Sequence, residues 1–162
     1  MAALKDALEA LGYAGVATYI NSGNVVLESK KSASAIEAEI EKVLPARFKL
    51  DSELIKVLAL TKARYKAMVA ACPKGLGAEP GKYHTDAIFL MGVARSREAF
   101  EAFTPREGVD QVWQGNGVIY HQRLSSQRTK SRLNRIIATP FYKSMTIRNW
   151  ATTLKLLDML DA

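Results

Sequence analysis

The sequence of 162 residues has little of several things, and each shortage excludes a class of protein. Its single cysteine, Cys72, excludes an internal disulfide framework and the small secreted scaffolds that depend on one. No apolar run approaches the roughly 20 residues that a membrane-spanning helix needs, so we expect no membrane partner. The N-terminus lacks the apolar block of a signal peptide, which predicts a cytoplasmic protein. Hydrophobic residues make up 48% of the chain, a content too high for a disordered one.

Acidic residues are absent from one long stretch. Between Asp110 and Asp158 there is no Asp or Glu, while the net charge of the chain is +7. The excess equals the seven basic residues found from His121 to Arg148, namely Arg123, Arg128, Lys130, Arg132, Arg135, Lys143 and Arg148. Because a segment of one sign attracts anions, we expect an anionic partner, either a phosphorylated small molecule or nucleic acid. A solvated basic face without a partner is the alternative.

Hydrophobic periodicity and turn residues predict a mixed α+β chain. Helices are expected over residues 4–11, 34–44, 61–72, 96–103, 127–138 and 150–160. Strands are expected over residues 16–20, 25–28, 54–60, 85–91, 110–114, 118–123 and 145–148. Pro45 is expected to close the second helix. Asn116 and Gly117, placed between two apolar runs, predict a hairpin turn.

The order of these elements repeats. Each half contains helix, hairpin, helix and strand, and in the second half a further strand, 85–91, comes first. The predicted fold class is α+β with two ferredoxin-like (β-α-β-β-α-β) repeats, the first missing its opening strand. The expected domains are 1–61, the first repeat; 62–82, a connecting helix and a Pro/Gly-rich linker; and 83–162, the second repeat with the C-terminal helix. A missing strand leaves an open sheet edge, which would allow a homodimer.

Two motifs carry a family resemblance. They are Ser22-Gly23-Asn24-Val25-Val26 near the start and Thr146-Ile147-Arg148-Asn149-Trp150-Ala151-Thr152 near the end. Through these motifs the chain resembles, over most of its length, a bacterial family of uncharacterised proteins known as domain of unknown function 1697. Members usually begin with a strand and loop similar to L-L-R-G-I-N-V-G-G, which this sequence lacks. The resemblance implies that the Arg and Gly residues of that loop are prime candidates for a functional site, and it implies no established activity.

The leading candidate for an anion site lies in the acid-free stretch. It comprises Lys130, Ser131, Arg132 and Arg148. Free backbone N–H groups in the first turn of the expected helix 127–138 would attract an anion, and Arg can hold a phosphate bidentately. The alternative is that the helix buries an ordinary apolar face and leaves these charges merely exposed.

Secondary candidates are polar residues in turns and at element ends: Asn21, Ser22, Gly23, Asn24, Arg128, Asn149 and Trp150. The first four could form a polar cup around Gly23, although the same residue types suit a plain turn. Asn149 also suits the N-cap of the last helix, and Trp150 suits a buried position.

The sequence predicts no catalytic residue, metal or cofactor. His84 and His121 are far apart in the chain, and no Cys or carboxylate lies at metal-ligand spacing from either. Neither a G-x-S-x-G elbow nor a nucleotide-triphosphate loop is present. The leading function is binding of an anionic partner at a basic groove. One alternative is an enzyme acting on a small phosphorylated or carboxylated substrate with the missing N-terminal loop, and the other is a dimerisation module.

Overall fold

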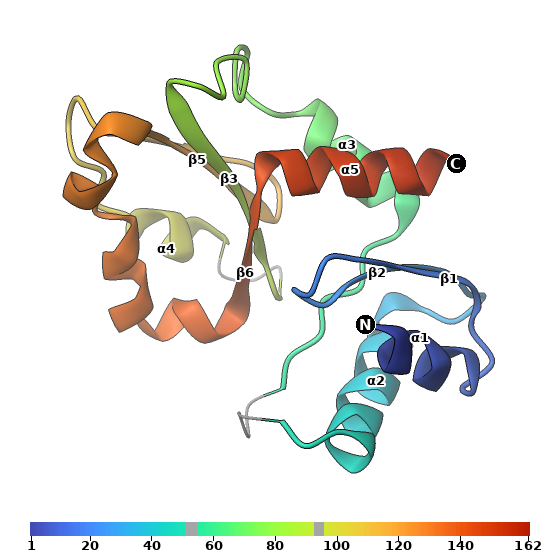
Figure 1. Cartoon of the computed structure of the whole chain (residues 1–162). Coiled ribbons are helices and arrows are strands. Elements are labelled where there is room, and N and C mark those ends of the chain that lie inside the picture. Colours follow the sequence, from blue (N-terminus) through green and yellow to red (C-terminus); the bar gives the residue numbers. More distant parts are fainter. Residues whose placement is uncertain (51–54, 93–95) are drawn as a thin grey trace. The chain divides into compact units, whose positions relative to one another are not determined.

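The computed structural model describes residues 1–50, 55–92 and 96–162, which belong to two compact units (Figure 1). The first unit consists of Met1–Lys62 and Leu156–Ala162, and the second of Ala63–Lys155. One sheet has two strands and the other has four, and all paired strands are antiparallel. The predicted mixed α+β class is therefore confirmed. No helix in the described ranges is long and apolar enough to cross a membrane.

The first unit is a hairpin with helices packed on it. Helix α1 (Ala2–Glu9) precedes strands β1 (Ala14–Tyr19) and β2 (Asn24–Glu28), and helix α2 (Ala33–Arg47) follows them. Tyr19 lies opposite Asn24 where the hairpin turns. The i, i+3, i+4 spacing of apolar residues gives α1 one buried side. That side contributes to a core centred on Leu8, Tyr13, Val16 and Ile40.

The prediction that Pro45 closes the second helix is wrong, because α2 continues through it to Arg47. Beyond the first turn of a helix, a proline removes one backbone hydrogen bond, here the one to the carbonyl of Glu41. In the last turn the chain recovers a closing bond, since the Phe48 N–H donates to the Leu44 carbonyl at 2.9 Å.

The predicted strand 54–60 is also wrong over the part that can be judged. Leu54 lies outside the described residues, and residues 55–60 form no strand. The N–H groups of Val57 and Ala59 donate to the carboxylates of Glu41 and Glu37 on α2, both at 2.9 Å. Because these side chains already bind the amides, the segment needs no neighbouring strand to satisfy them.

The second unit contains a four-stranded sheet in the order β4-β5-β3-β6. Its strands are β3 (Tyr83–Leu90), β4 (Asp110–Gln114), β5 (Val118–Leu124) and β6 (Met145–Asn149). Its helices are α3 (Lys62–Ala70), α4 (Ser96–Glu101) and the first part of α5 (Trp150–Asp161). The predicted hairpin at Asn116 and Gly117 joins β4 to β5, with Gly117 at the positive φ of 77° that favours glycine.

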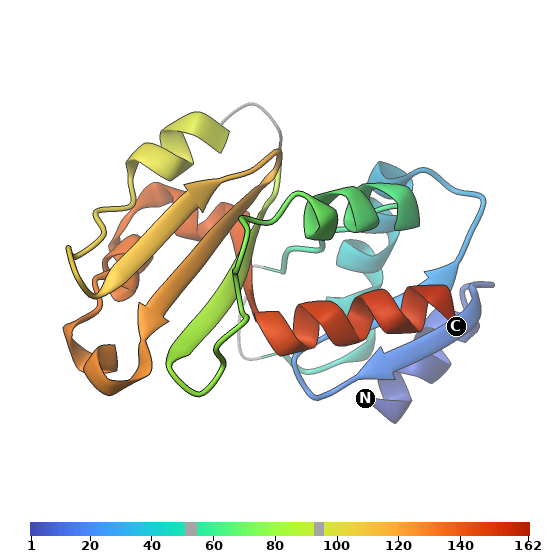
Figure 2. The same cartoon turned by 90° about the horizontal axis from the view of Figure 1, so that it is seen from above.

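Both faces of this sheet are covered (Figure 2). On one face, Ile88 and Ile119 pack with residues of α4 and of the segment between β5 and β6. On the other face, Tyr65 of α3 stacks on Phe89, and Trp150 of α5 meets the ring of Tyr120 edge-on. The sheet is therefore the central layer of the second unit.

The predicted basic α-helix 127–138 is wrong. The chain instead forms three short 3-10 helices, η2 (Ser125–Lys130), η3 (Leu133–Ala138) and η4 (Pro140–Ser144). The break falls at Ser131 and Arg132, because side chains bind the N–H groups that an α-helix would use. The Arg132 N–H donates to Asp110 Oδ2 at 2.8 Å, and the Leu133 N–H donates to Ser131 Oγ at 3.2 Å. The predicted anion site relied on free N–H groups in the first turn of an α-helix over residues 127–138, and this segment contains no α-helix.

Candidate functional site

Five ionisable side chains meet at one end of the four-stranded sheet. Asp86 of β3 lies opposite His121 of β5, and His84 lies opposite Arg123. Asp110 of β4 lies opposite Arg123 on its other side. Because alternate residues of a strand share a face, these five side chains point to the same face of the sheet. We call them the polar cluster.

The polar cluster contains a continuous line of alternating imidazoles and carboxylates. His84 Nε2 lies 3.2 Å from Asp86 Oδ1, and His121 Nδ1 lies 3.6 Å from Asp86 Oδ2. His121 Nε2 lies 3.4 Å from Asp110 Oδ1. The His84 side chain is 32% exposed, whereas the side chains of the other three are almost fully buried. The line therefore runs from the surface at His84 to the interior at Asp110.

Asp110 anchors the segment that follows β5. Its Oδ2 accepts hydrogen bonds from the backbone N–H groups of Arg132 at 2.8 Å and Arg106 at 3.0 Å. Burial alone would raise the pKa of Asp110, but the bonds from Arg132, from the Ser131 side chain and from Arg106 outweigh it, so the pKa is lowered. The anion that Ser131 and the Arg132 amide hold in this structure is thus a carboxylate of the same chain.

Arg123 differs from the rest of the polar cluster, because it forms no hydrogen bond or ion pair through its side chain with any described residue. The residue is 8% exposed, and its Nε is enclosed without a hydrogen-bond acceptor. Among the residues that the structure describes, none accepts a hydrogen bond from its guanidinium or forms an ion pair with it. Buried arginines are normally paired, because their charge is costly to remove from water.

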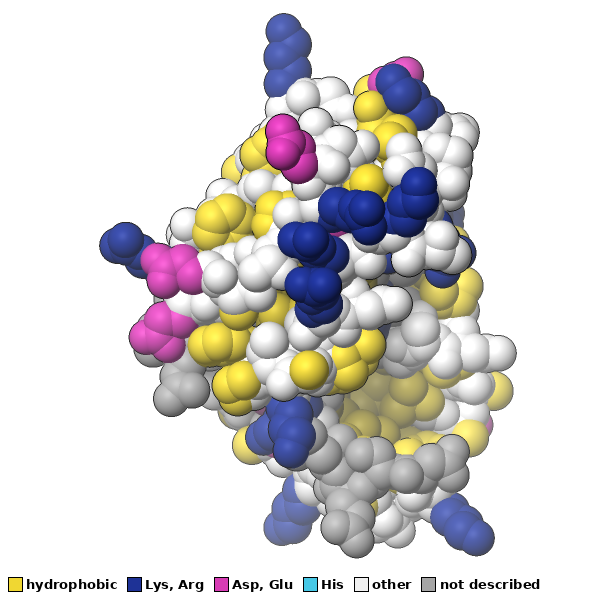
Figure 3. All heavy atoms as spheres, turned by 90° about the vertical axis from the view of Figure 1, so that its left-hand side faces the viewer, with side chains coloured by type: hydrophobic (Ala, Val, Ile, Leu, Met, Phe, Trp, Pro, Cys, Tyr) yellow, Lys and Arg dark blue, Asp and Glu magenta, His cyan; other side chains and the backbone are white. Residues whose placement is uncertain are grey.

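The segment from Ser125 to Ser144, which we call the cationic segment, presents five exposed basic residues: Arg128, Lys130, Arg132, Arg135 and Lys143. Figure 3 shows Lys and Arg side chains gathered on the side of the molecule where η2 and η3 lie in Figure 1. Within the described ranges, none of the five forms an ion pair with a carboxylate. Their charges face solvent.

The structure does not bring Arg148 to the other predicted anion-site residues. Arg148 lies opposite Ala87 in the sheet, whereas its neighbour Asn149 lies opposite Asp86 of the polar cluster. Arg148 therefore points to the face that carries α3, away from Ser131. Its guanidinium donates to Thr146 Oγ1 at 2.7 Å and to the Ile147 carbonyl at 2.9 Å, and burial lowers its pKa.

The polar residues of the first hairpin turn bind one another. Asn24 is buried, and its Nδ2 donates to Ser22 Oγ at 2.8 Å and to the Tyr19 carbonyl at 3.2 Å. Gly23 adopts a positive φ of 73°. These are the properties that a turn requires of Asn, Ser and Gly. Asn21 lies in the same turn and is exposed.

Asn149 and Trp150 have the structural roles that the sequence analysis gave as the alternative to ligand binding, an N-cap and a buried side chain. Asn149 Oδ1 accepts a hydrogen bond from the Ala151 N–H at 2.9 Å, which caps the N-terminus of α5. Trp150 is buried and packs so closely on Gly77 that a Cβ there would lie 2.3 Å from the indole Cδ1.

Sequence reasoning missed the polar cluster. It treated His84 and His121 as isolated, and the structure corrects this: His84 has Asp86 beside it on β3, and strand pairing places Asp86 and Asp110 next to His121. The available signal was the i, i+2 spacing of His84 with Asp86 and of His121 with Arg123. That spacing puts each pair on one face of a strand. In the described part of the chain, no group of three or more His, Cys, Asp or Glu residues is arranged to hold a metal ion.

A pocket of about 240 Å³ opens at a different place in the second unit. Its lining is mostly apolar and consists of Leu90, Met91, Gly92, Ala99, Pro140, Phe141 and Ser144. It contains no member of the polar cluster and no charged residue, so its chemistry does not match an anionic ligand.

Comparisons with known proteins add a family and a fold. A family model described as "Protein of unknown function (DUF1697)" matches residues 1–120. The structure of conserved bacterial protein SP0830 from Streptococcus pneumoniae superimposes with a TM-score of 0.77 at 22% identity, covering 99% of this chain and 88% of that one. At this identity the likeness shows a shared fold. Among curated proteins, none matches the sequence.

Proposed function

The chain belongs to the DUF1697 family of proteins of unknown function, and for this member we propose binding of an anionic partner, nucleic acid, through the cationic segment. One observation supports this proposal above all. Five exposed cations lie within 16 consecutive residues, from Arg128 to Lys143, without a carboxylate in that stretch and without ion pairs inside the described ranges. Such a surface attracts polyanions, and its cations release the counterions condensed on a nucleic acid when the two bind.

The spread of the charges favours nucleic acid over a phosphorylated metabolite. A small ligand needs a concave site with converging polar groups. The pocket lined by Leu90 and Phe141 is apolar, and the exposed cations are spread over three successive short helices and the link between the first two. A polyanion with a regular row of phosphates matches cations that are distributed in this way.

Fluorescence anisotropy with labelled single-stranded and duplex oligonucleotides of about 20 nucleotides tests the proposal, since protein sites on single strands span up to about 16 nucleotides. We expect binding at low salt that weakens steeply between about 50 and 200 mM. The double variant R128E/K130E should bind at least about tenfold more weakly and lower the salt slope by about 1.4 on single strands and about 1.8 on duplex. Absence of wild-type binding at low salt would contradict the proposal.

A matched control separates local charge from net charge. Lys74→Glu with Lys155→Glu makes the same change in net charge at exposed positions outside the cationic segment. This control should keep most of the wild-type affinity. Equal losses in the two double variants would instead indicate attraction by net charge alone.

We also propose that the second unit is a ferredoxin-like repeat. The chain order strand, α4, β4, β5, 3-10 segment, β6 and the sheet order β4-β5-β3-β6 support this, because they match the split β-α-β arrangement with its second helix replaced. For the first unit, the hairpin β1–β2 is the part that corresponds. An experimental structure of a chain extended upstream would test the duplication by whether a further strand pairs with that hairpin.

A further inference from the structure

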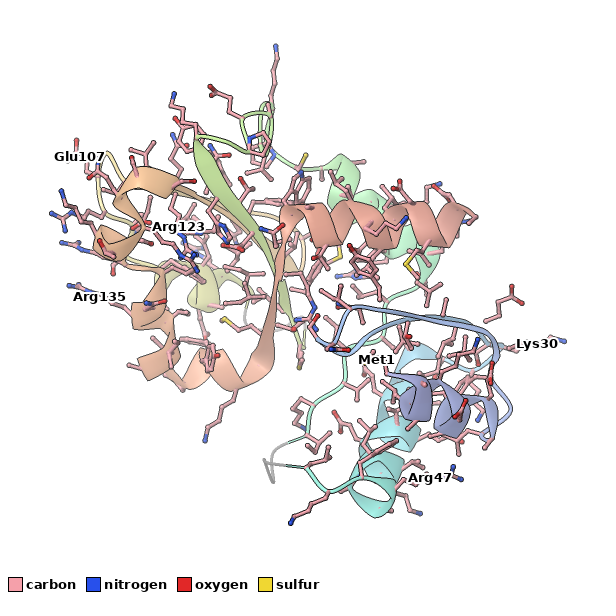
Figure 4. The ribbon with its side chains drawn as sticks, viewed as in Figure 1. Met1, Lys30, Arg47, Glu107, Arg123 and Arg135 are labelled. Atoms are coloured by element: carbon pink, nitrogen blue, oxygen red, sulfur yellow. The ribbon has the colours of Figure 1, made fainter. Side chains whose placement is uncertain are left out.

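The unpartnered guanidinium of Arg123 indicates where the proposed ligand makes its deepest contact. The Nε atom of Arg123 is enclosed without a hydrogen-bond partner, whereas its two Nη groups, which make no hydrogen bond to a described residue, are not enclosed and keep contact with the surface. Figure 4 shows the Arg123 side chain between the sheet and the 3-10 helices, whereas Arg135 points outward. Arg123 is thus a cation held in place by the fold with its tip accessible.

Neither carboxylate next to Arg123 pairs with its guanidinium. Asp110 accepts hydrogen bonds from Arg132, Ser131 and Arg106, and it faces His121. Asp86 Oδ1 lies 3.2 Å from His84 Nε2, whereas Asp86 Oδ2 lies 3.6 Å from His121 Nδ1 and has no hydrogen-bond partner. Neither carboxylate lies within 4.0 Å of the Arg123 guanidinium as an ion pair. The positive charge of Arg123 is therefore not neutralised at contact distance.

We propose that Arg123 binds a phosphate oxygen of the ligand at the end of the β3–β5 pair. This inference rests on the proposed function and names the group in the protein that holds one phosphate. Arginine suits this role because its planar donors match phosphate oxygens. Because Arg123 lies in a largely desolvated position, its bond to an anion is stronger than that of an exposed lysine.

Neighbouring elements fit a phosphate at this place. His84 lies directly opposite Arg123 across the strand pair and is partly exposed, so a ring N–H can serve as a further donor. The helix η2 begins two residues after Arg123 and carries Arg128 and Lys130. The phosphates on either side of the one bound by Arg123 would face these exposed cations.

The Nε–H of Arg123 provides a direct spectroscopic readout. Enclosure slows the exchange of this proton with water, so a nitrogen–proton correlation spectrum should resolve its resonance, and its loss in Arg123→Met assigns it. We expect the resonance to shift on addition of an oligonucleotide and, with weaker affinity, on addition of inorganic phosphate. No shift with either probe overturns the assignment of Arg123.

Affinity and stability together exclude a merely structural role. Arg123→Met should lower oligonucleotide affinity about tenfold, the typical worth of a charge-assisted hydrogen bond. Its melting temperature should stay within about 4 °C of wild type, because no described acceptor loses a bond. A large loss of melting temperature with unchanged affinity contradicts the proposal and indicates a structural role.

The two proposals fail in different ways. If oligonucleotides bind through the cationic segment and Arg123→Met binds as tightly as wild type, the Arg123 assignment is wrong and the proposed function stands. If inorganic phosphate shifts the Nε–H resonance but oligonucleotides do not bind, Arg123 takes a small phosphate and the nucleic-acid proposal is wrong. If neither probe has an effect, both are wrong.

Discussion

Asp110→Asn tests whether one buried carboxylate organises the cationic segment. The Asp110 carboxylate accepts two backbone N–H bonds, at 2.8 and 3.0 Å, and a bond from the Ser131 side chain. Asn keeps one oxygen that can accept a hydrogen bond, but it loses the charge and turns an NH₂ group toward donors. Hydrogen bonds to charged groups contribute about 1.5–3 kcal/mol each, and part of one survives in Asn. We expect a loss of about 3 kcal/mol in the free energy of unfolding.

Thermal unfolding should report this loss directly. For a chain of this length, 1 kcal/mol corresponds to about 2–4 °C, so the melting temperature should fall by about 6–12 °C. Glu107→Gln is the matched control, because it neutralises an exposed carboxylate three residues away. That control should change the free energy of unfolding by less than about 0.5 kcal/mol. Equal effects of the two substitutions would refute the reasoning.

The pH dependence of the difference in melting temperature between wild type and Asp110→Asn gives a second test. The folded state lowers the pKa of Asp110, so its contribution is complete above the unfolded-state pKa of about 3.9. It disappears as the pH falls through the lower folded-state pKa. The gap in melting temperature between wild type and Asp110→Asn should therefore be widest near neutral pH and close in strong acid. A gap that is unchanged at pH values far below 3.9 would show that ionisation of Asp110 is not its cause.

Limited trypsin digestion separates the anchor from general stability. Loss of the Asp110 bonds releases the backbone at Ser131 and Arg132, so cleavage after Arg128, Lys130 and Arg132 should become faster in Asp110→Asn. Cleavage after Lys74 and Lys155, in other parts of the chain, should keep its wild-type rate under native conditions. Uniform acceleration at all sites would indicate global unfolding instead of a local release.

Two further predictions concern packing and alkaline pH. Gly77→Ala should cost about 2–4 kcal/mol in chemical denaturation, because its Cβ would lie 2.3 Å from the Trp150 ring, whereas Gly75→Ala, also at positive φ but with open space, should cost about 1 kcal/mol. Equal costs would show that backbone strain, not the Trp150 contact, sets the value. Burial raises the pKa of Tyr13, Tyr65 and Tyr120 to about 12, so an ultraviolet titration of the folded chain should show three of its six tyrosines ionising late. Because these groups ionise near 10 in the unfolded chain, the free energy of unfolding should fall as the pH rises from about 10 to 12. Ionisation of all six near 10 in the folded chain would contradict this.

Local patterns were sufficient for much of the second unit. Strand β4 has the predicted bounds, and β5 and β6 extend theirs by one residue, because alternation along a strand and an Asn-Gly turn are properties of adjacent residues. Asn149 as the cap of α5 belongs to the same category, since its bond to Ala151 spans two residues. Features decided within a few residues were predictable.

Features decided by distant residues were not predictable in this way. The break in the expected basic helix depends on Asp110, which lies 22 residues before Arg132. The failure of the strand expected at 54–60 depends on Glu37 and Glu41, which bind amides 16 to 22 residues away. The polar cluster depends on strand register, which the separate patterns of His84 and His121 do not contain.

The same carboxylate that disrupts the predicted helix explains why Arg123 is left without a partner. Asp110 is the residue across the strand pair from Arg123, and as its direct neighbour on the same face it would be the natural counterion. Backbone and hydroxyl donors of the cationic segment occupy Asp110 instead. If Asp110 is replaced by Asn, an ion pair with Arg123 is no longer possible, and the guanidinium still has no counterion. Asp110→Asn should therefore leave the intrinsic phosphate contact of Arg123 intact while it loosens the exposed cations. Weakened oligonucleotide binding with a preserved Nε–H shift on phosphate addition would distinguish these two effects.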